Sequence, residues 1–518
     1  MSLQLTKLVK PKLNAIFSIY RRFKLSKVTK QSINIVWLKR DLRTQDHLPL
    51  KMAEDSDLPY IILYLIEPSL LKRPDWSPRH LWFALESIKN INLTLKAYNK
   101  QVEVIYSEAE EIFDSLSTKY QILNIFSHIE TGVKETWDRD VRLRNHFKSK
   151  RINWIESPTN GVIRGINSRN GWDRRWYETM RMPIIHNRYS NRKTVSIKFN
   201  RPLPKSLTTS LSLNTENFQP PGEKYAWEYL SSFVVDRSEA YLSNISNPSK
   251  SKKSCSRISV YLSWGNISSK QCYQYIKYHP KFDQNKRNFN GFLTRLKWRC
   301  HFMQKFEDEC EYETRCINRG YELLERERNQ EFITNWMRGK TGFPMIDASI
   351  RSVVASGWLN FRMRAMLVSF FCHHLDQDWR DGANFLAKQF LDYEPGIHFP
   401  QFQMQAGTTG INTIRIYNPV KQSQDHDKEG VFIKEWIPEL ESCPVDTIHE
   451  PWKYYSSTDF FQDIKSHLAY HKPIIDHKIG ASNARKKIWG HRSNDLVKLE
   501  KQRILDKHTR SNKLRMKT

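Results

Sequence analysis

Short apolar runs alternate with longer amphipathic stretches along the first third of the chain. Five of these runs have the length and the Ile, Val and Tyr content of buried β-strands: Ile33–Leu38, Tyr60–Ile66, Val102–Tyr106, Ile122–Phe126 and Ile152–Ile155. Between them, the clearest helical pattern begins at Ser77, a capping residue that is followed by proline at the first helical position. Strands that alternate with helices predict parallel βαβ units in a doubly wound sheet, whose ligands lie beyond the carboxyl ends of the strands.

The strand pattern does not return after about residue 220. Four long amphipathic stretches follow, and they predict an all-helical second half: Glu223–Asn244, Phe289–Arg328, Pro344–Ser356 and Trp358–Asp376. Within that half, the Ser- and Lys-rich stretch Asn247–Lys253 predicts a loop. Residues 161–220 contain frequent Pro, Asn, Ser and Arg and little periodicity, so we expect a linker there.

These patterns together predict the α/β fold class. We expect a doubly wound parallel αβ domain over residues 33–160 and, after the linker, a large all-helical domain over residues 221–475. No GxGxxG or GxxxxGK[ST] loop follows the first strand, so the sequence does not predict a standard dinucleotide or P-loop site at that position.

Both ends of the chain are basic. Residues 1–40 contain no Asp or Glu, and we expect residues 1–32 to form a disordered basic extension. An acid-free basic leader is also compatible with an organelle transit peptide, so we expect a cytoplasmic protein, or an organellar one if residues 1–32 act as such a signal. Residues 476–518 contain thirteen Lys or Arg against four acids and predict a basic helix or tail.

The composition narrows the classes of function. Across 518 residues, Lys and Arg number 83 against 55 Asp and Glu, a formal charge of +28 that favours a polyanionic partner such as nucleic acid; a generally basic surface is the alternative. No run approaches the length of a membrane span. Seven scattered cysteines argue against a disulfide-stapled secreted scaffold, and no His, Cys or carboxylate set has convincing metal spacing, so we expect no metal.

Five segments, in order along the chain, carry recognisable motifs. They are VWLKRDLR from Val36 to Arg43; SRIS from Ser256 to Ser259 with Gly265; GKTGFPMID from Gly339 to Asp347; Gly357-Trp358 with Arg362, Arg364 and Asp378-Trp-Arg380; and RIYNP from Arg415 to Pro419 with WIPEL from Trp436 to Leu440. Together they resemble the photolyase/cryptochrome family, in which V-W-F-R-R-D-L-R forms the first strand and turn and S-R-L-S-x-x-L-x-x-G binds phosphate. The resemblance implies an αβ antenna domain followed by a helical FAD-binding domain.

The resemblance also implies the cofactors and their contacts. It implies FAD and a second antenna chromophore of the folate or deazaflavin type. The FAD contacts implied by motif match are Tyr241, Ser256, Arg257, Ser259, Arg299, Trp358, Arg364, Asp392, Glu394 and His398. Serine hydroxyls and an arginine ahead of a helix suit a pyrophosphate, and Arg364 paired with Asp392 would stabilise an anionic reduced flavin. For any one of these residues, the alternative is an ordinary salt bridge between helices.

For function, the resemblance implies a monomeric, light-dependent enzyme that splits pyrimidine dimers, with the cyclobutane type favoured. UV-damaged DNA would bind through its phosphates without sequence reading, and the damaged bases would flip into a pocket. The implied DNA contacts are Trp298, Arg362, Met404 and Gln422. The residues assigned to catalysis are His398, Trp379 and Trp298.

The lesion-facing positions depart from the family pattern. Arg295, Phe361, Ala365, His398 and Met404 stand where photolyases of the cyclobutane type usually have Glu, Asn, Met or His, Asn and Trp, respectively. These departures keep a cryptochrome-like photoreceptor without repair activity open as an alternative. A third reading is a non-catalytic nucleic-acid-binding protein on a degenerate flavin fold. His398 could tune the protonation of a flavin or be a neutral packing histidine.

The tryptophan electron relay of the family is only partly present. Trp379 matches its middle member, whereas the flavin-proximal position is Phe402. Because phenylalanine is a poor redox relay, we expect photoreduction to follow another route, for example through Trp358 or Tyr393, or to be slow.

Overall fold

The first domain is a parallel sheet covered by helices on both faces. The computed structural model describes residues 30–166, 168–191, 195, 201–453 and 470–508. Its five strands are β1 (Ser32–Leu38), β2 (Tyr60–Ile66), β3 (Val102–Tyr106), β4 (Gln121–His128) and β5 (Asn153–Ser157). They pair in parallel in the order β3-β2-β1-β4-β5. The five predicted strands are therefore confirmed, with β4 and β5 extending a few residues beyond the predicted runs.

Alternating side chains of the strands build two separate cores. Ile33, Ile35 and Trp37 face helices α5 (Ala109–Lys119) and α6 (Lys134–Ser149), where they form one buried cluster. Val36 and Leu38 face the other way, toward α2 (Leu48–Asp55) and α4 (Pro78–Leu95). That second cluster continues into Tyr261, Phe289 and Leu296 of the helical half, so the two halves share one hydrophobic core. The short helix α3 (Pro68–Leu71) and the turn η1 (Lys96–Tyr98) complete the αβ domain, residues 32–157.

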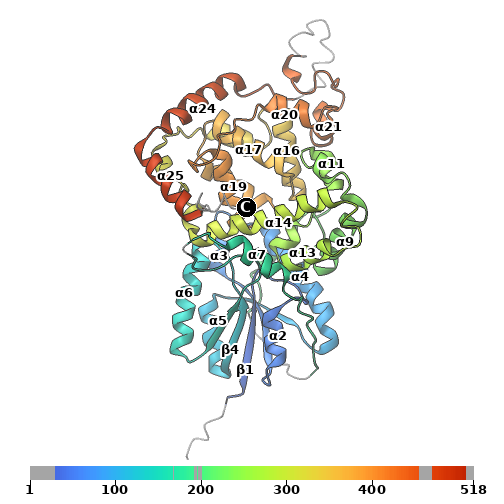
Figure 1. Cartoon of the computed structure of the whole chain (residues 1–518), viewed down its shortest axis with the longest axis vertical. Helices are drawn as coiled ribbons and strands as arrows, with labels where there is room; N and C mark the ends of the chain where they lie inside the picture. Colours follow the sequence, from blue (N-terminus) through green and yellow to red (C-terminus); the bar gives the residue numbers. More distant parts are fainter. Residues whose placement is uncertain (1–29, 167, 192–194, 196–200, 454–469, 509–518) are drawn as a thin grey trace, which may run out of the picture.

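The second half is helical in the described residues, as predicted, and lies on top of the αβ domain (Figure 1). We refer to residues 223–508 as the helical domain. Its first helices are α9 (Glu223–Ser232), α10 (Tyr241–Asn244), α11 (Pro248–Ser254), α12 (Ser259–Ser263), α13 (Ser269–Lys277) and α14 (Lys286–Asp308). They are followed by α15 (Gln330–Met337), α16 (Pro344–Ser356), α17 (Phe361–Ser369), α18 (Trp379–Gln389), α19 (Pro395–Ala406), α20 (Pro419–His426), α21 (Val431–Trp436), α24 (His477–His491) and α25 (Asp495–His508). No helix among these described elements is long and apolar enough to cross a membrane.

Several helix predictions were too long. Pro344–Ser356 is confirmed as α16, whereas the predicted helix Glu223–Asn244 is interrupted by a π-helical turn, η2 (Phe233–Arg237). The predicted helix Phe289–Arg328 ends at Asp308 and continues as two short 3-10 turns, η3 (Cys310–Glu313) and η4 (Arg319–Leu323). The predicted helix Trp358–Asp376 is α17 followed by a π-helical turn, η5 (Phe370–His374).

The prediction of a loop at Asn247–Lys253 was wrong, because this stretch forms α11. The Asn247 side chain caps the helix by accepting a hydrogen bond from the Lys250 N–H at 2.8 Å, and Pro248 occupies the first turn. The Ser and Lys content that suggested a loop is compatible with a short, capped surface helix.

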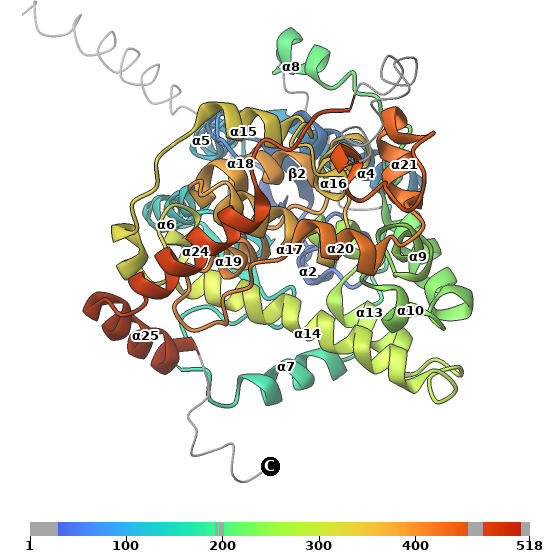
Figure 2. The same cartoon turned by 90° about the horizontal axis from the view of Figure 1, so that it is seen from above.

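Residues 161–220, which we expected to be a linker with little periodicity, include regular helices. They contain α7 (Trp172–Arg181) and the short α8 (Lys205–Ser210). Trp172, Trp176 and Met180 recur at a spacing of four and are all buried. Helix α7 runs alongside α14, to which the ion pair of Asp173 and Lys297 ties it at 3.0 Å (Figure 2). The spacing of these apolar residues could have predicted the helix, although the polar composition of the region suggested a linker.

The two basic ends differ in what the structure describes. Of the predicted basic extension, residues 1–32, positions 1–29 lie outside the described residues. Within 476–518, helices α24 and α25 pack on the helical domain, with Ile488, Val497 and Ile504 buried. This part of the chain up to His508 therefore contributes to the core of the helical domain.

We expect Gly265→Ala to destabilise the junction of the two domains. Gly265 has φ +68°, and an added Cβ would lie 2.4 Å from the Arg40 carbonyl oxygen and 2.5 Å from the Asp41 Cα. Such overpacking typically lowers the free energy of unfolding by about 1–3 kcal/mol. Gly165→Ala is the matched control, because Gly165 has φ +74° with nothing within 4 Å and isolates the backbone strain. Equal losses for both variants in urea unfolding would show that the contact at Gly265 adds nothing.

Candidate functional site

One large cavity of about 790 Å³ lies in the helical domain. Its size is in the range of pockets that hold cofactors and other small ligands. The structure brings all ten of the predicted cofactor contacts to its wall: Tyr241, Ser256, Arg257, Ser259, Arg299, Trp358, Arg364, Asp392, Glu394 and His398. They come from α10, α12, α14, α17 and α19 and from the segments that join these helices, so only the tertiary fold assembles them.

At one part of the wall, a half-buried arginine is held in an unusual backbone conformation. Arg257 has φ +59°, which is uncommon for a residue with a side chain and is found preferentially at functional sites. Its guanidinium lies over the Trp358 ring at 3.9 Å. Burial lowers the pKa of Arg257 to about 10, so it stays charged at neutral pH. Its Nε has no hydrogen-bond partner among the described residues, although Ser256 and Ser259 line the same wall.

Arg364 and Asp392 form a partly exposed ion pair at the cavity wall. Arg364 Nη2 donates to Asp392 Oδ2 at 2.9 Å and Arg364 Nε donates to the Leu359 carbonyl at 2.7 Å. The guanidinium also stacks on the Phe390 ring at 3.9 Å. Asp392 is buried, and its Oδ1 has no partner in the described part of the chain. This carboxylate oxygen is therefore available to accept a hydrogen bond from a ligand in the cavity.

A second pair, Arg299 with Glu394, closes the cavity toward the αβ domain. Arg299 Nη2 donates to Glu394 Oε2 at 3.0 Å, and Arg40 approaches Glu394 Oε1 at 3.7 Å. Burial raises the pKa of Glu394, while the two arginines act in the opposite direction. The Nε of Arg299 is buried without an acceptor in the described ranges. Arg257, Arg299 and Asp392 together thus present two unpaired donors and one unpaired acceptor, as a ligand with phosphate and ring-amide groups requires.

His398 lines the cavity as a neutral imidazole. Burial lowers its pKa to about 4. Its Nε2 donates to the Ala383 carbonyl at 2.9 Å, so the lone pair lies on Nδ1. His398 can therefore accept a hydrogen bond from a ligand, but it does not offer a positive charge at neutral pH.

The predicted lesion side is open to solvent. Trp298, on α14, is 54% exposed although it lines the cavity, and Met404, on α19, lines the same space. Phe361 is 44% exposed, and Arg295 lies over the Tyr241 ring at 5.6 Å. The cavity thus has a rim with an exposed aromatic ring beside cationic side chains.

Three predicted site residues are not among those that line the cavity. Trp379 is buried in the core, with its ring edge-on to Phe399 at 6.5 Å. Arg362 turns away on α17 and its Nη1 donates to the Tyr417 hydroxyl at 3.3 Å. Gln422, on α20, has a buried Oε1 without a partner among the described residues. Their assigned roles therefore stay predictions.

Sequence reasoning missed one end of the cavity. His301 and Lys305 follow Trp298 on α14, and Ile504 and His508 reach the cavity from α25. Burial lowers the pKa of His301 to about 2 and that of Lys305 to about 8. His301 and Lys305, one and two turns beyond Trp298, could have been found from helical spacing, but nothing in the sequence places α25 there.

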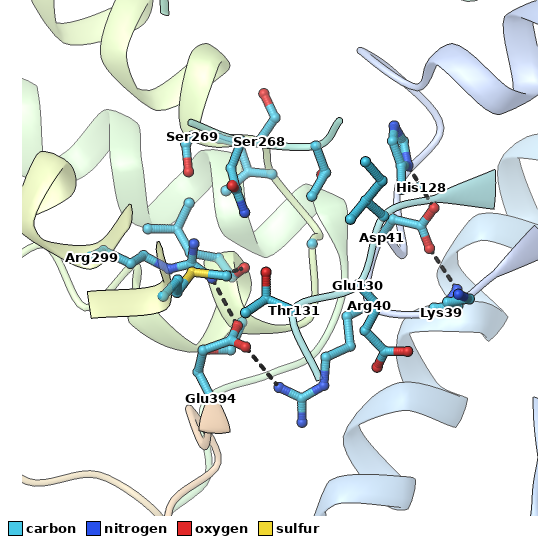
Figure 3. A pocket seen from close by; sticks show the side chains of 18 of the residues that line it. Lys39, Arg40, Asp41, His128, Glu130, Thr131, Ser268, Ser269, Arg299 and Glu394 are labelled. Atoms are coloured by element: carbon cyan, nitrogen blue, oxygen red, sulfur yellow. Dashed lines mark hydrogen bonds and ion pairs between the residues drawn. The ribbon is translucent and has the colours of Figure 1, made fainter. Parts of the chain in front are cut away.

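A second, small cavity lies at the switch point of the sheet, between β1 and β4 (Figure 3). Lys39, Arg40 and His128 line it from the αβ domain, and Arg299 and Glu394 from the helical domain. Its volume is about 40 Å³, which is room for a few waters. This crevice does not accommodate a folate or a deazaflavin, which would need a cavity of the order of 300 Å³ or more.

Asp41, His47 and His128, at the edge of this crevice, are close enough to bind a metal ion. Asp41 Oδ2 lies 2.9 Å from His47 Nε2 and 2.7 Å from His128 Nδ1. However, His47 Nδ1 accepts the Leu50 N–H that caps α2, so the ring proton is on Nε2. A protonated Nε2 donates to Asp41 and cannot be a metal ligand. The cluster therefore stabilises the carboxyl ends of β1 and β4 by hydrogen bonds.

Comparison with known families identifies both halves of the chain. Residues 34–168 match a family model described as DNA photolyase, and residues 292–490 match one described as FAD binding domain of DNA photolyase. Deoxyribodipyrimidine photo-lyase of Alkalihalophilus pseudofirmus is 27% identical over 480 residues, which cover 86% of this chain and 95% of that protein. Cryptochrome DASH of Synechocystis is 24% identical over 484 residues, with 85% and 95% covered.

Solved structures show the same fold. The class III photolyase from Agrobacterium tumefaciens superposes with a TM-score of 0.78 at 20% identity, covering 91% of this chain and all of that one. The photolyase from Sulfolobus tokodaii, solved with two FAD molecules, gives a TM-score of 0.73 at 21% identity, covering 88% and 100%. At this identity the likeness establishes the architecture alone.

We expect His398 to make the protein sensitive to acid. Its pKa is about 4 in the folded chain, against about 6.5 for an unperturbed histidine. Below pH 6.5 the unfolded chain binds a proton that the folded chain does not, so His398 lowers the free energy of unfolding by up to about 1.4 kcal/mol per pH unit down to pH 4. In His398→Asn, the free energy of unfolding, measured by urea unfolding at a series of pH values, should fall less steeply between pH 6.5 and pH 4. Exposed His186→Asn is the control, and equal slopes for the wild type and His398→Asn would refute the assignment.

Proposed function

The chain belongs to the photolyase/cryptochrome family, and we propose that it is a light-driven DNA repair enzyme that uses FAD to split UV-induced pyrimidine dimers, with the cyclobutane type favoured. The observation that carries this proposal is the composition of one cavity. Its interior presents unpaired polar atoms of Arg257, Arg299 and Asp392, and its rim presents the exposed ring of Trp298.

The residues present fit FAD. Arg257, Ser256 and Ser259 would hold the pyrophosphate, and Arg364 with Asp392 would hold the flavin ring. FAD supplies the light-driven electron transfer when it is bound. The Arg364 guanidinium would stabilise negative charge on the reduced ring, and the Nδ1 of His398 would accept a hydrogen bond. The side chains of Asp392 and Glu394 and the Tyr393 ring have little exposure, which would limit the access of water to this side of the cavity.

Damaged DNA would bind across the cavity rim. The net charge of +28 favours phosphate contacts, which position a strand without reading its sequence. A flipped pyrimidine pair would stack on Trp298 and contact Met404. Arg362 and Gln422 would contact the strand outside the cavity. A monomer suffices for this site, and the cytoplasm, or an organelle if residues 1–32 are a transit peptide, stays the expected location.

A photoreceptor without repair activity is the second candidate. Arg295 at the rim and the exposed Phe361 favour it, because both replace polar groups that photolyases use near the lesion. The similarity to cryptochromes DASH also keeps it open. A pigment of the folate or deazaflavin type also stays a prediction, to which the crevice at the switch point gives no support.

Repair under light separates the two candidates. Reduced, FAD-loaded protein is mixed with an oligonucleotide that contains one cyclobutane dimer, and repair is scored after blue illumination and in the dark. We expect light-dependent loss of the dimer. Absence of repair of both this lesion and a (6-4) lesion, by protein that holds FAD and binds the oligonucleotide, would favour the photoreceptor.

We expect Arg364→Leu to lose FAD. The substitution leaves Asp392 as a buried carboxylate without its cation, and breaking such a pair typically costs about 3–5 kcal/mol. Arg362→Leu is the matched control two residues away on α17, because Arg362 bonds Tyr417 and does not line the cavity. Flavin absorbance per chain measures the outcome. Full flavin content in Arg364→Leu would overturn the assignment of the flavin site.

We expect Trp298→Ala to weaken binding of damaged DNA about tenfold or more while FAD is retained, because stacking on a base is worth about 1–3 kcal/mol. Tyr278→Ala, which removes another exposed aromatic ring of the helical domain outside the cavity, should leave binding unchanged. The measurement is the ratio of affinities for damaged and intact oligonucleotides. An unchanged ratio in Trp298→Ala would remove this residue from the lesion site.

A further inference from the structure

The segment that carries Asp392 and Glu394 is held by side chains rather than by regular secondary structure. It follows the end of α18 at Gln389 and precedes α19 at Pro395. Six successive carbonyl oxygens, from Lys388 to Tyr393, each accept a hydrogen bond from a different side chain. The donors, in that order, are Ser77, Arg79, His80, Trp264, Ser263 and Arg40.

Four of these six donors belong to the αβ domain. Ser77 Oγ donates to Lys388 O at 2.9 Å, Arg79 Nη1 to Gln389 O at 2.7 Å, and His80 Nε2 to Phe390 O at 3.0 Å. All three donors lie at the N-terminus of α4, which therefore caps the C-terminus of α18. The last carbonyls of a helix have no partner within it, and the positive end of the α4 dipole meets the negative end of α18.

Arg40 holds the end of the segment. Its Nη1 donates to Tyr393 O at 2.8 Å, and the guanidinium also approaches Glu394 at 3.7 Å and stacks on Trp264 at 4.8 Å. Tyr393 is held by two further contacts, because its hydroxyl donates to Asp75 and its ring stacks on His80 at 5.5 Å. The αβ domain thus bonds the carbonyls of Phe390, two residues before Asp392, and of Tyr393, directly after it.

We propose that Arg40, Ser77, Arg79 and His80, which we call the interdomain clamp, are positioning residues for the flavin site. The clamp sets where Asp392 and Glu394 stand relative to Arg364 and Arg299, with which they pair at 2.9 and 3.0 Å. This inference rests on the proposed flavin function. It gives the αβ domain a direct role in cofactor binding that does not depend on a second pigment.

The clamp would couple FAD binding to contact between the two domains, and this coupling is reciprocal. If the interface holds the segment in its flavin-binding position, FAD stabilises the interface by the same free energy with which the interface favours FAD. Loss of one buried hydrogen bond of this kind corresponds to about tenfold in affinity.

His80 offers the cleanest variants. His80→Phe keeps an aromatic ring next to Tyr393 but removes the donor to Phe390 O and the acceptor for the Ser77 N–H. His80→Gln can supply both, since glutamine at this position of a helix completes a capping box. Arg164→Met is the control, because Arg164 joins the two domains away from the segment: it donates to Glu307 of the helical domain at 2.7 Å and to the Glu130 carbonyl of the αβ domain at 3.0 Å.

Two readouts test the clamp. In flavin-free protein, amide hydrogen exchange of residues 388–394 should be about tenfold faster in His80→Phe and near the wild-type rate in His80→Gln and Arg164→Met. In FAD-loaded protein, the rate of FAD release, followed by the fluorescence of free flavin, should rise about tenfold in His80→Phe alone.

Equal effects of His80→Phe and Arg164→Met on both readouts would reduce the clamp to general interdomain stability and overturn the proposal, as would unchanged exchange in His80→Phe. Failure of His80→Gln to restore the wild-type values would also count against it. If the wild type takes up no FAD, the proposed function fails, and the exchange measurement alone then decides whether the αβ domain positions this segment.

Discussion

Six successive main-chain carbonyls, from Lys388 at the end of α18 to Tyr393 before α19, impose the constraint on which the site depends. A carbonyl that loses water without gaining a donor costs about 1–3 kcal/mol. The hydrogen bonds to the Phe390 and Leu391 carbonyls are buried, and the other four are half-buried. Side-chain donors from both domains satisfy them, so contact between the domains helps to hold the loop with Asp392 and Glu394 in place. The shared core around Phe83 and Tyr261 and the close approach of Gly265 to Arg40 keep that contact tight.

In the cavity, by contrast, several polar atoms have no hydrogen-bond partner among the described residues. Arg257, Arg299 and Asp392 have buried polar atoms that the described chain leaves without partners, next to a backbone at Arg257 that is strained. Natural proteins retain such features where a ligand completes the hydrogen bonds. The two features therefore belong together. The clamp holds the polar groups of the cavity in place, and a bound cofactor would supply their missing hydrogen-bond partners.

Local patterns in the sequence predicted the strands and the capped helices α4 and α16, because both depend on neighbouring residues. The same reasoning failed at Asn247–Lys253, where composition outweighed a cap, and at α7, where Trp172 and Trp176 lay in a polar stretch. Family motifs predicted ten cofactor contacts, all of which are among the residues that line the cavity. They did not place Trp379, Arg362 or Gln422 on its wall, and no motif shows that Ser77, Arg79 and His80 meet residues some 310 positions away. Contacts of that range arise from packing of whole domains.

Titration of FAD into the flavin-free chain tests the central claim most directly. We expect saturation at a single FAD per chain, with the flavin fluorescence quenched by the aromatic wall of the cavity and the binding unaffected by intact DNA. Absence of saturable binding, or binding that leaves the fluorescence of the flavin as it is in water, would show that the cavity of the helical domain is not a flavin site.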